Sequence, residues 1–252
     1  MFSFSAIGRL ALVTGGLIFA WFAIVQLFDL PQYLLPSPLS VGQALSSQST
    51  LLWLHSKATL VEILFGLSLG FLFGLLSALI LCAFEKLSSF LLPLLVISQA
   101  IPVFAIAPLL VLWLGYGMAS KIAMSILVIY FPVTTTCYDG LRNTPLQWLD
   151  LARTMGVSKK TLLFKVRLPA ALPSLASGLR IAVSIAPIGA IIGEWVGSSE
   201  GLGYLMLQAN ARMQVDLMFA ALFILMMMAL VLYFLADYGL RRLIPWAAHL
   251  GS

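Results

Sequence analysis

The chain contains 252 residues, of which 62% are hydrophobic and only 9% are charged, and its net charge is +5. A soluble domain carries roughly 25% charged residues, so this chain lacks the polar surface that a water-soluble protein of its size needs. The lipid bilayer must surround most of it. We therefore expect an all-α bundle of membrane-spanning helices that forms a single transmembrane domain over residues 1–252.

Uncharged apolar intervals mark the expected spans, because a helix needs about 20 residues to cross ~30 Å of hydrocarbon. Five such intervals are Leu10–Phe28, Ile63–Phe84, Leu87–Ser120, Ile122–Tyr138 and Leu217–Ala236, and a sixth, Ile181–Gly193, has only 13 residues but can extend to a full crossing with its flanks from Pro173 to Val196. The first is longer than the apolar region of a signal peptide, so a retained helix is favoured over a cleaved one. The third is too long for one simple span. Its Pro93, Pro102 and Pro108 predict one crossing followed by a broken or re-entrant stretch, and the chain has about six transmembrane helices in all.

Basic residues are distributed unevenly between alternate connecting segments. With the N-terminus inside, the inner segments hold eleven Lys and Arg residues, and the outer segments hold only Lys57, Lys121 and Arg212. Because cytoplasmic loops carry the excess of basic residues, both termini are predicted to lie in the cytoplasm. This distribution also accounts for the positive net charge without a nucleic-acid partner.

The inner loop at residues 139–180 differs from the rest of the chain, because it holds nine charged residues, seven of them basic. Thr144 is placed to cap a short helix that Gly156 would end in a left-handed conformation. Ser158 is placed to cap a second helix that Pro169 would stop. We expect this element either to dock against a partner or to lie on anionic lipid headgroups.

Residues within this loop follow a motif of permease subunits from binding-protein-dependent ABC importers. That motif is Glu-Ala-Ala, three residues, Gly, nine residues, then Ile-x-Leu-Pro. This chain has the same spacing, with Asp150, Leu151 and Ala152, then Gly156, then Val166 to Pro169. The Asp and Val replacements are mild, whereas Leu151 is larger than the family's alanine and could alter the fit. Further segments resemble the branch that imports nitrate, alkanesulfonates, taurine and pyrimidine thiamine precursors: Leu35–Pro38, Gln99–Pro102, Asp139–Asn143 and Gly193–Gly197.

This resemblance implies a type I ABC importer permease, a non-catalytic subunit of the cell (inner) membrane that binds no cofactor itself. A separate cytoplasmic ATPase would hydrolyse ATP, an extracytoplasmic binding protein would deliver the solute, and a second permease copy would complete the pathway. The ATPase-coupling residues that it implies are Asp150, Leu151, Ala152, Arg153, Gly156, Leu168 and Pro169. The run at residues 209–222 is most similar to permeases for hydroxymethylpyrimidine-type thiamine precursors, with sulfonate, taurine and nitrate as alternative substrates.

Small and polar residues inside the spans are the remaining candidates for specific roles. Gly66, Gly70 and Gly74 repeat at GxxxG spacing, which predicts close packing between helices. Five residues are candidates to line the substrate pathway: Gln99, Tyr130, Thr134, Ser184 and Glu194. Thr and Ser hydroxyls in such helices more often bond their own backbone. Glu62 and Glu194 stand at the ends of apolar runs, so we expect both at the outer membrane interface.

Catalysis and metal binding are not expected from this sequence. The chain has no GxxxxGK[ST] phosphate loop and so is not itself the ATPase, and its two cysteines, Cys82 and Cys137, lack metal-ligand spacing. An ion-coupled secondary transporter or channel is the alternative function. Against it, the sequence shows no inverted repeat and few charges within its spans.

Overall fold

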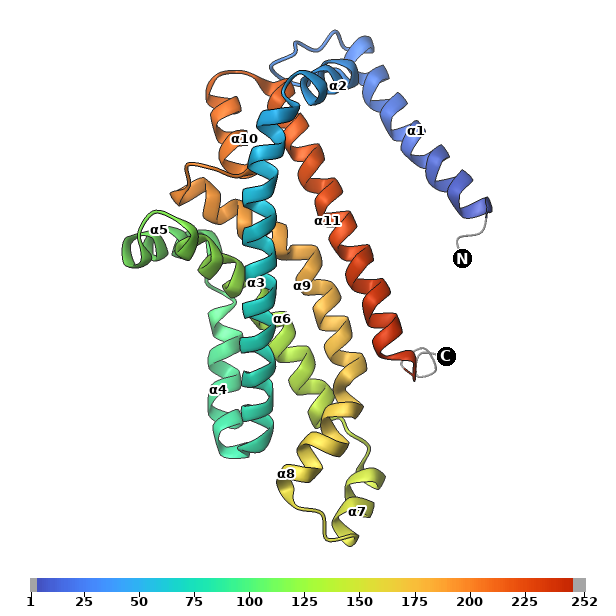
Figure 1. Cartoon of the computed structure of the whole chain (residues 1–252), viewed down its shortest axis with the longest axis vertical. Coiled ribbons are helices and arrows are strands. Elements are labelled where there is room, and N and C mark those ends of the chain that lie inside the picture. The colour runs from blue at the N-terminus through green and yellow to red at the C-terminus, as the bar shows by residue number, and fades with distance from the viewer. Residues whose placement is uncertain (1–3, 247–252) are drawn as a thin grey trace.

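A computed structural model describes residues 4–246, and that range contains only helices and connecting segments (Figure 1). The helices are α1 Phe4–Leu27, α2 Pro38–Ser47, α3 Ser49–Ala83, α4 Glu85–Ser98, α5 Val103–Leu114, α6 Met118–Arg142, α7 Leu146–Thr154, α8 Lys159–Leu162, α9 Leu168–Gly197, α10 Leu202–Ala211 and α11 Val215–Leu243. A π-helical turn, Leu163–Arg167, joins α8 to α9. The expected all-α architecture is confirmed.

Four helices are long and apolar enough to cross a membrane: α3, α6, the continuous helix of α8 and α9, and α11. The bent pair of α4 and α5 has the required length and composition when the two helices are taken together, which makes a fifth. In α1, the stretch Leu12–Leu27 forms a shorter apolar helix. Within the described residues, the six expected spans therefore become four or five of sufficient length.

The helices α4 and α5 meet at an angle of 99°. The break falls at Pro102, which directly precedes α5 and has no N–H to continue the hydrogen-bond ladder of α4. Pro93 and Pro108 remain inside their helices. The broken stretch predicted from these prolines is confirmed, and α5 runs sideways from the end of α4 (Figure 1).

The helix α3 begins at Ser49, far ahead of the apolar run that starts at Ile63. Its 35 residues extend over about 52 Å at 1.5 Å per residue, well beyond the ~30 Å of hydrocarbon. The first turns of α3 therefore extend past the membrane span that the sequence predicts. This extension carries the polar residues His55, Thr59 and Glu62.

The predicted helix stop at Pro169 is wrong. The Leu168 N–H donates to the Leu163 carbonyl five residues earlier, as a π turn requires. This wider turn makes room for the proline ring, which in a regular α-helix would clash with the preceding turn. As a result, α8, the π turn and α9 form one helix from Lys159 to Gly197.

The glycines of α3 lie against α6. A Cβ atom added at Gly70 would lie 2.7 Å from Ile129 Cγ2, and one at Gly74 would lie 2.8 Å from Val133 Cγ1. At Gly66, an added Cβ would overlap Ser125. Glycine thus lets the two backbones approach closely where lipid gives helices no hydrophobic reason to associate.

Glycines of α9 also pack closely against α6. A Cβ atom added at Gly189 would lie 2.9 Å from Ser125 Cα, and one at Gly193 would lie 2.9 Å from Lys121 Cα. The side chains of Ile129, Val133 and Ala182 pack in the buried core that these helices share. The helix α6 is therefore in close contact with a glycine row from each of two neighbours.

A second apolar cluster lies at one end of the bundle, where α2 and α10 pack on α3 and α11. Its buried members include Leu52 of α3, Leu202 and Ala209 of α10, and Leu217 of α11. Figure 1 shows α2 and α10 at this end, which we call the α10 end, and α7 and α8 at the opposite end, which we call the α7 end.

The glycine contacts predict a specific difference between two Gly→Ala variants. A Cβ at Gly239 of α11 meets no atom within 4 Å, so Gly239→Ala should gain about 0.5–1 kcal/mol of helix propensity. Gly70→Ala should instead lose about 1–3 kcal/mol, because Ile129 must move. Thermal unfolding in detergent should give a melting temperature several degrees lower for Gly70→Ala, and equal values for the two variants would contradict this packing.

Candidate functional site

Two regions are candidates for a functional site. The first is α7 with the turns around it. Pro145, in an extended conformation, occupies the N-cap position, and no side chain caps α7. The expected capping role of Thr144 is therefore wrong. Its buried hydroxyl donates to the Leu141 carbonyl at 3.0 Å and so satisfies the end of α6 instead.

The C-terminus of α7 is closed by a Schellman motif. Gly156 has φ of +71°, and its N–H donates to the Arg153 carbonyl, while the Val157 N–H donates to the Ala152 carbonyl. Ser158 then accepts from the Thr161 N–H and starts α8, as the sequence predicts. A left-handed glycine between two helices fixes the angle between α7 and α8 without a flexible linker.

The two faces of α7 differ sharply. Leu149 and Ala152 are buried, whereas four large apolar side chains are more than half exposed: Leu146, Trp148, Leu151 and Met155. Asp150 and Arg153 form an exposed ion pair at 3.2 Å, which contributes little stability by itself. Since Leu151 is mostly exposed, its size relative to alanine has little effect on how α7 packs against the rest of the chain. Leu168 is half-buried and Pro169 is exposed, beyond the π turn.

An ion-pair cluster fixes α11 to α9. The Asp237 carboxylate accepts from Arg180 Nε at 2.7 Å and from Arg241 Nε at 2.8 Å. Arg180 and Asp237 are mostly buried. They lie 57 positions apart in the sequence and connect α9 to α11. This contact ties the last helix to the helix that continues from the loop.

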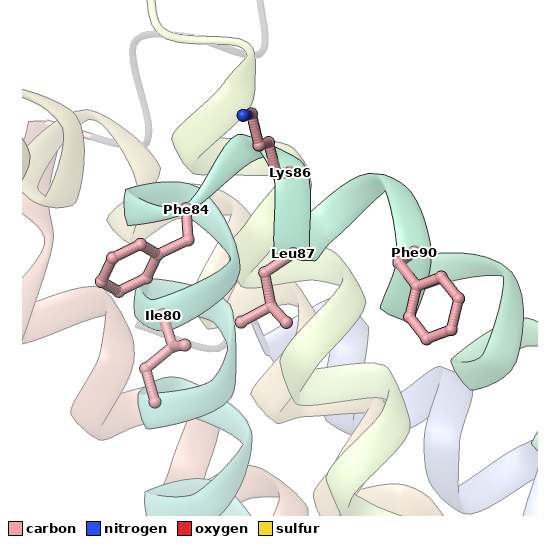
Figure 2. A pocket seen from close by; sticks show the side chains of 5 residues that line it. All are labelled: Ile80, Phe84, Lys86, Leu87 and Phe90. Carbon is pink, nitrogen blue, oxygen red and sulfur yellow. The ribbon is translucent and has the colours of Figure 1, made fainter.

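A hollow opens at the turn from α3 into α4, lined by Ile80, Phe84, Lys86, Leu87 and Phe90 (Figure 2). Lys86 is the only charged residue among them, and four of the five lining side chains are hydrocarbon. Binding sites for small polar solutes need several convergent polar groups. The hollow instead suits lipid tails.

The candidate pathway residues are dispersed over the bundle. Gln99 is exposed at the C-cap of α4, and Ser184 is exposed on α9 with its hydroxyl bonded to the Arg180 carbonyl. Thr134 is fully buried and donates to the Tyr130 carbonyl at 2.7 Å. These hydroxyls bond their own helix backbones. Among the five candidates, only Glu194 belongs to a network that joins several helices.

That network is the second region, and it contains three buried charges. Glu62 of α3, Lys121 of α6 and Glu194 of α9 have exposed fractions of 0%, 2% and 1%. Lys121 Nζ lies 2.5 Å from Glu62 Oε1 and donates to Ser198 Oγ at 3.1 Å. Both glutamates are thus covered by protein, whereas their expected depth at the outer membrane interface stays a prediction.

The N-terminus of α10 is bonded entirely by side chains of other helices. Its cap residue, Gly201, donates its N–H to His55 Nδ1 at 3.0 Å, and the Leu202 N–H donates to Thr59 Oγ1 at 2.8 Å. The next two N–H groups, of Gly203 and Tyr204, donate to Glu194 Oε2 at 2.5 and 3.4 Å. All four N–H groups that a helix leaves free at its start therefore have buried acceptors.

Thr59 and two glycines complete this arrangement around Glu194. The Thr59 hydroxyl donates to Glu194 Oε1 at 2.5 Å. Gly201 has φ of +110°, and a Cβ there would overlap the Glu194 carboxyl group, while a Cβ at Gly203 would lie 2.8 Å from Glu194 Oε2. Glycine is thus required at both positions for the carboxylate to reach the backbone of α10.

Sequence reasoning missed this network although one signal for it is present. His55, Thr59 and Glu62 follow a spacing of four and three residues, which places them on one face of a helix. They precede the apolar run, and nothing in the sequence itself links this helix face to Lys121 or Glu194. Within the part of the chain that the structure describes, no group of three His, Cys, Asp or Glu residues is arranged to hold a metal ion.

Known proteins that are similar in sequence to this helical chain are membrane transport proteins. Residues 70–248 match the family model described as "Binding-protein-dependent transport system inner membrane component". A Haemophilus influenzae protein, "Probable ABC transporter permease protein", is 66% identical over 233 residues, which cover 92% of this chain and 95% of that protein. The formylaminopyrimidine transport permease protein ThiX of Halalkalibacterium halodurans is 42% identical over 85% of this chain and 86% of its own.

A solved structure supports the fold independently. The chain is similar to an inward-facing structure of the MetNI methionine ABC transporter, with a TM-score of 0.65 and 22% identity, over 73% of this chain and 92% of that one. Together with the family match over most of the chain, this similarity identifies the architecture. The chain therefore belongs to the family of binding-protein-dependent transport system inner membrane components, as a non-catalytic permease subunit of an ABC importer with the type I fold.

Proposed function

We propose that this permease forms half of the pathway of an ATP-driven importer, and that a cytoplasmic ATPase drives it by gripping α7. The observation that carries this proposal is the construction of α7: a short helix with four exposed apolar side chains, rigidly closed by Gly156. An exposed apolar patch on an otherwise basic loop fits a protein partner. The residues proposed to act in coupling are Asp150, Leu151, Ala152, Arg153, Gly156, Leu168 and Pro169.

The route from α7 to the far end of the bundle is a single helix. Because α8 continues through the π turn into α9, a displacement at α7 is transmitted along the whole of Lys159–Gly197. The glycine contacts with α6 give α9 a surface along which it can shift. The far end of this helix carries Glu194, which contacts both α3 and α10.

The charge distribution supports the orientation of this machinery. Seven basic residues in the loop at 139–180 favour the cytoplasm for the α7 end, and both termini then lie on the same side. The α10 end would face the binding protein that delivers solute. A second copy of this chain would supply the other half of the pathway.

The substrate proposed is a pyrimidine precursor of thiamine. Its support is the 42% identity to a formylaminopyrimidine permease together with the resemblance of residues 209–222 to that group. Glu194 is bonded by Thr59 and α10, and Lys121 by Glu62 and Ser198, so neither of these two offers the solute a free ionic group in this arrangement. Selection among solutes would rest largely with the separate binding protein.

The first prediction concerns Gly156. A β-branched residue is strained at φ of +71°, so Gly156→Val should tilt or unfold the end of α7. We expect this variant to reach the membrane at normal levels but to lower ATP-dependent uptake by about tenfold or more, since even 1.4 kcal/mol of lost coupling gives that factor. Uptake into right-side-out vesicles of matched protein content, with ATP inside and the binding protein outside, measures it.

The matched control is Gly156→Asn at the same position. Asn tolerates left-handed backbone better than any other residue with a side chain, so this variant should retain most of the uptake. Equal transport by the Val and Asn variants would show that the closure of α7 has no part in coupling.

The second prediction concerns the energy source. The chain should co-purify with an ATPase subunit, and uptake should require ATP and continue when ionophores collapse the ion gradients. An ion-coupled transporter would show the reverse. Trp148→Ala and Leu151→Glu, which change the exposed face of α7, should weaken retention of the ATPase, whereas the neighbouring Thr154→Ala should not.

The third prediction concerns the solute. Vesicles that contain the full transporter should accumulate labelled formylaminopyrimidine or hydroxymethylpyrimidine in preference to taurine, an alkanesulfonate or nitrate. Competition by an excess of each unlabelled compound gives the order of preference. Uptake of taurine or a sulfonate that pyrimidines do not inhibit would reject the pyrimidine assignment while leaving the importer assignment intact.

A further inference from the structure

The three buried charges at the α10 end come from three separate helices. Glu62, Lys121 and Glu194 are each at least 98% buried, and the ion pair between Lys121 and Glu62 is 2.5 Å long. Glu194 lies close enough to interact electrostatically with both Lys121 and Glu62. One amino group is therefore placed beside two carboxyl groups, away from water, in a chain with few charged residues.

We propose that Glu62, Lys121 and Glu194 form a latch that holds α10 closed over the α10 end of the bundle, and that each transport cycle opens it. The three residues are positioning residues for transport and do not bind the solute. This proposal rests on the proposed function, because it assigns to α9 the motion that the ATPase drives from α7.

The first support for the latch is the way in which α10 is held. A helix usually has its own capping residue, but α10 begins at Gly201, which has no side chain to cap it. His55, Thr59 and Glu194 take over that task from α3 and α9. If α9 moves relative to α3, these acceptors separate, and the N–H groups at the start of α10 lose their hydrogen bonds together.

The second support is the position of each charge relative to the moving parts. Lys121 is on α6 and contacts Ser198, which directly follows α9, as well as Glu62 of α3. Glu194 is on α9 and contacts Thr59 of α3. Each helix of the core thus contributes one charge, and a shift of α9 relative to α3 or α6 must change the contacts of Glu194 or Lys121.

The third support is the chemistry of the contact. A buried charge without its partner is strongly destabilising, whereas apolar residues of similar size often stabilise a fold as well as a buried ion pair does. Charged groups, however, are stable in two states: paired with each other when dry, or hydrated when water enters. An apolar contact is stable only when dry, so a charged contact suits a surface that must open and close.

The experiment measures opening of α10 directly. Ala209 of α10 is 1% exposed and packs in the apolar cluster at the α10 end. In a chain with Ala209→Cys, Cys82→Ser and Cys137→Ala, assembled with its ATPase in membrane vesicles, a membrane-impermeant maleimide should label position 209 slowly. Addition of ATP and the binding protein should speed the labelling during turnover.

Loss of the latch should make labelling of position 209 fast even without ATP. With Lys121→Met added, labelling without nucleotide should become roughly tenfold faster or more, because two buried carboxylates lose their counter-charge. Glu200→Gln is the matched control, since Glu200 is exposed at the same end of the bundle, and it should leave the rate unchanged. An unchanged rate in Lys121→Met would overturn the proposal.

Two further variants separate a latch from a general loss of folding. Thr59→Val keeps the shape of the side chain and removes only the hydroxyl that bridges Glu194 and Leu202, so it should speed labelling to a smaller extent. The exchange of Glu62→Lys with Lys121→Glu leaves one ammonium between two carboxylates and should restore slow labelling that either single change loses. Failure of the exchange, with normal thermal stability, would count against the latch.

Failure of the latch and failure of the importer assignment give different results. If no ATPase binds the chain, the proposed function fails, while the nucleotide-free labelling of the Lys121 variants still tests the closed contact. If the ATPase binds and drives uptake but position 209 is never labelled faster during turnover, the latch fails and the importer assignment stands.

Discussion

A helix that starts inside a membrane protein presents free N–H groups that lipid cannot satisfy, and this constraint determines the α10 end of the molecule. Gly201 and Leu202 bond to His55 and Thr59, and the following two N–H groups bond to Glu194. For these acceptors to reach α10, the helix α3 must begin well ahead of its apolar run, at Ser49. The extension of α3, the burial of Glu194 and the two glycines of α10 are all consequences of one requirement for hydrogen bonding.

At the centre of the bundle, a different constraint applies. Helices in lipid gain nothing from hiding apolar side chains, so their association depends on close backbone contact. The helix α6 obtains that contact from the glycines of α3 and α9, with Ser125 placed between Gly66 and Gly189. The charged contact at Lys121 lies one turn further along the same helix. Tight packing in the middle and ionic contacts at the end are thus supplied by the same three helices.

The sequence predicted those features that depend on local chemistry. The broken span follows from Pro102, and the Schellman closure follows from Gly156, because each residue dictates the backbone around itself. Two local details, and the features that depend on distant partners, were predicted poorly. Pro169 does not stop a helix, since a π turn accommodates it, and Thr144 bonds backward to α6. The burial of Glu62 and Glu194 could not be predicted, because the sequence gives no sign that an extended helix and α10 would cover them.

The distance in sequence between the members of the buried network bears on biogenesis. The hydrogen bond between Thr59 and Glu194 joins residues 135 positions apart. During synthesis, Glu62 therefore reaches the membrane long before Lys121 and Glu194 exist, and the overhang of α3 lets water hydrate its carboxylate in the meantime. A chain that ends before α9 would keep the Glu62–Lys121 pair but would lack Glu194 and the start of α10 that bonds to it, so this end of the bundle can close only after α9 and α10 are made.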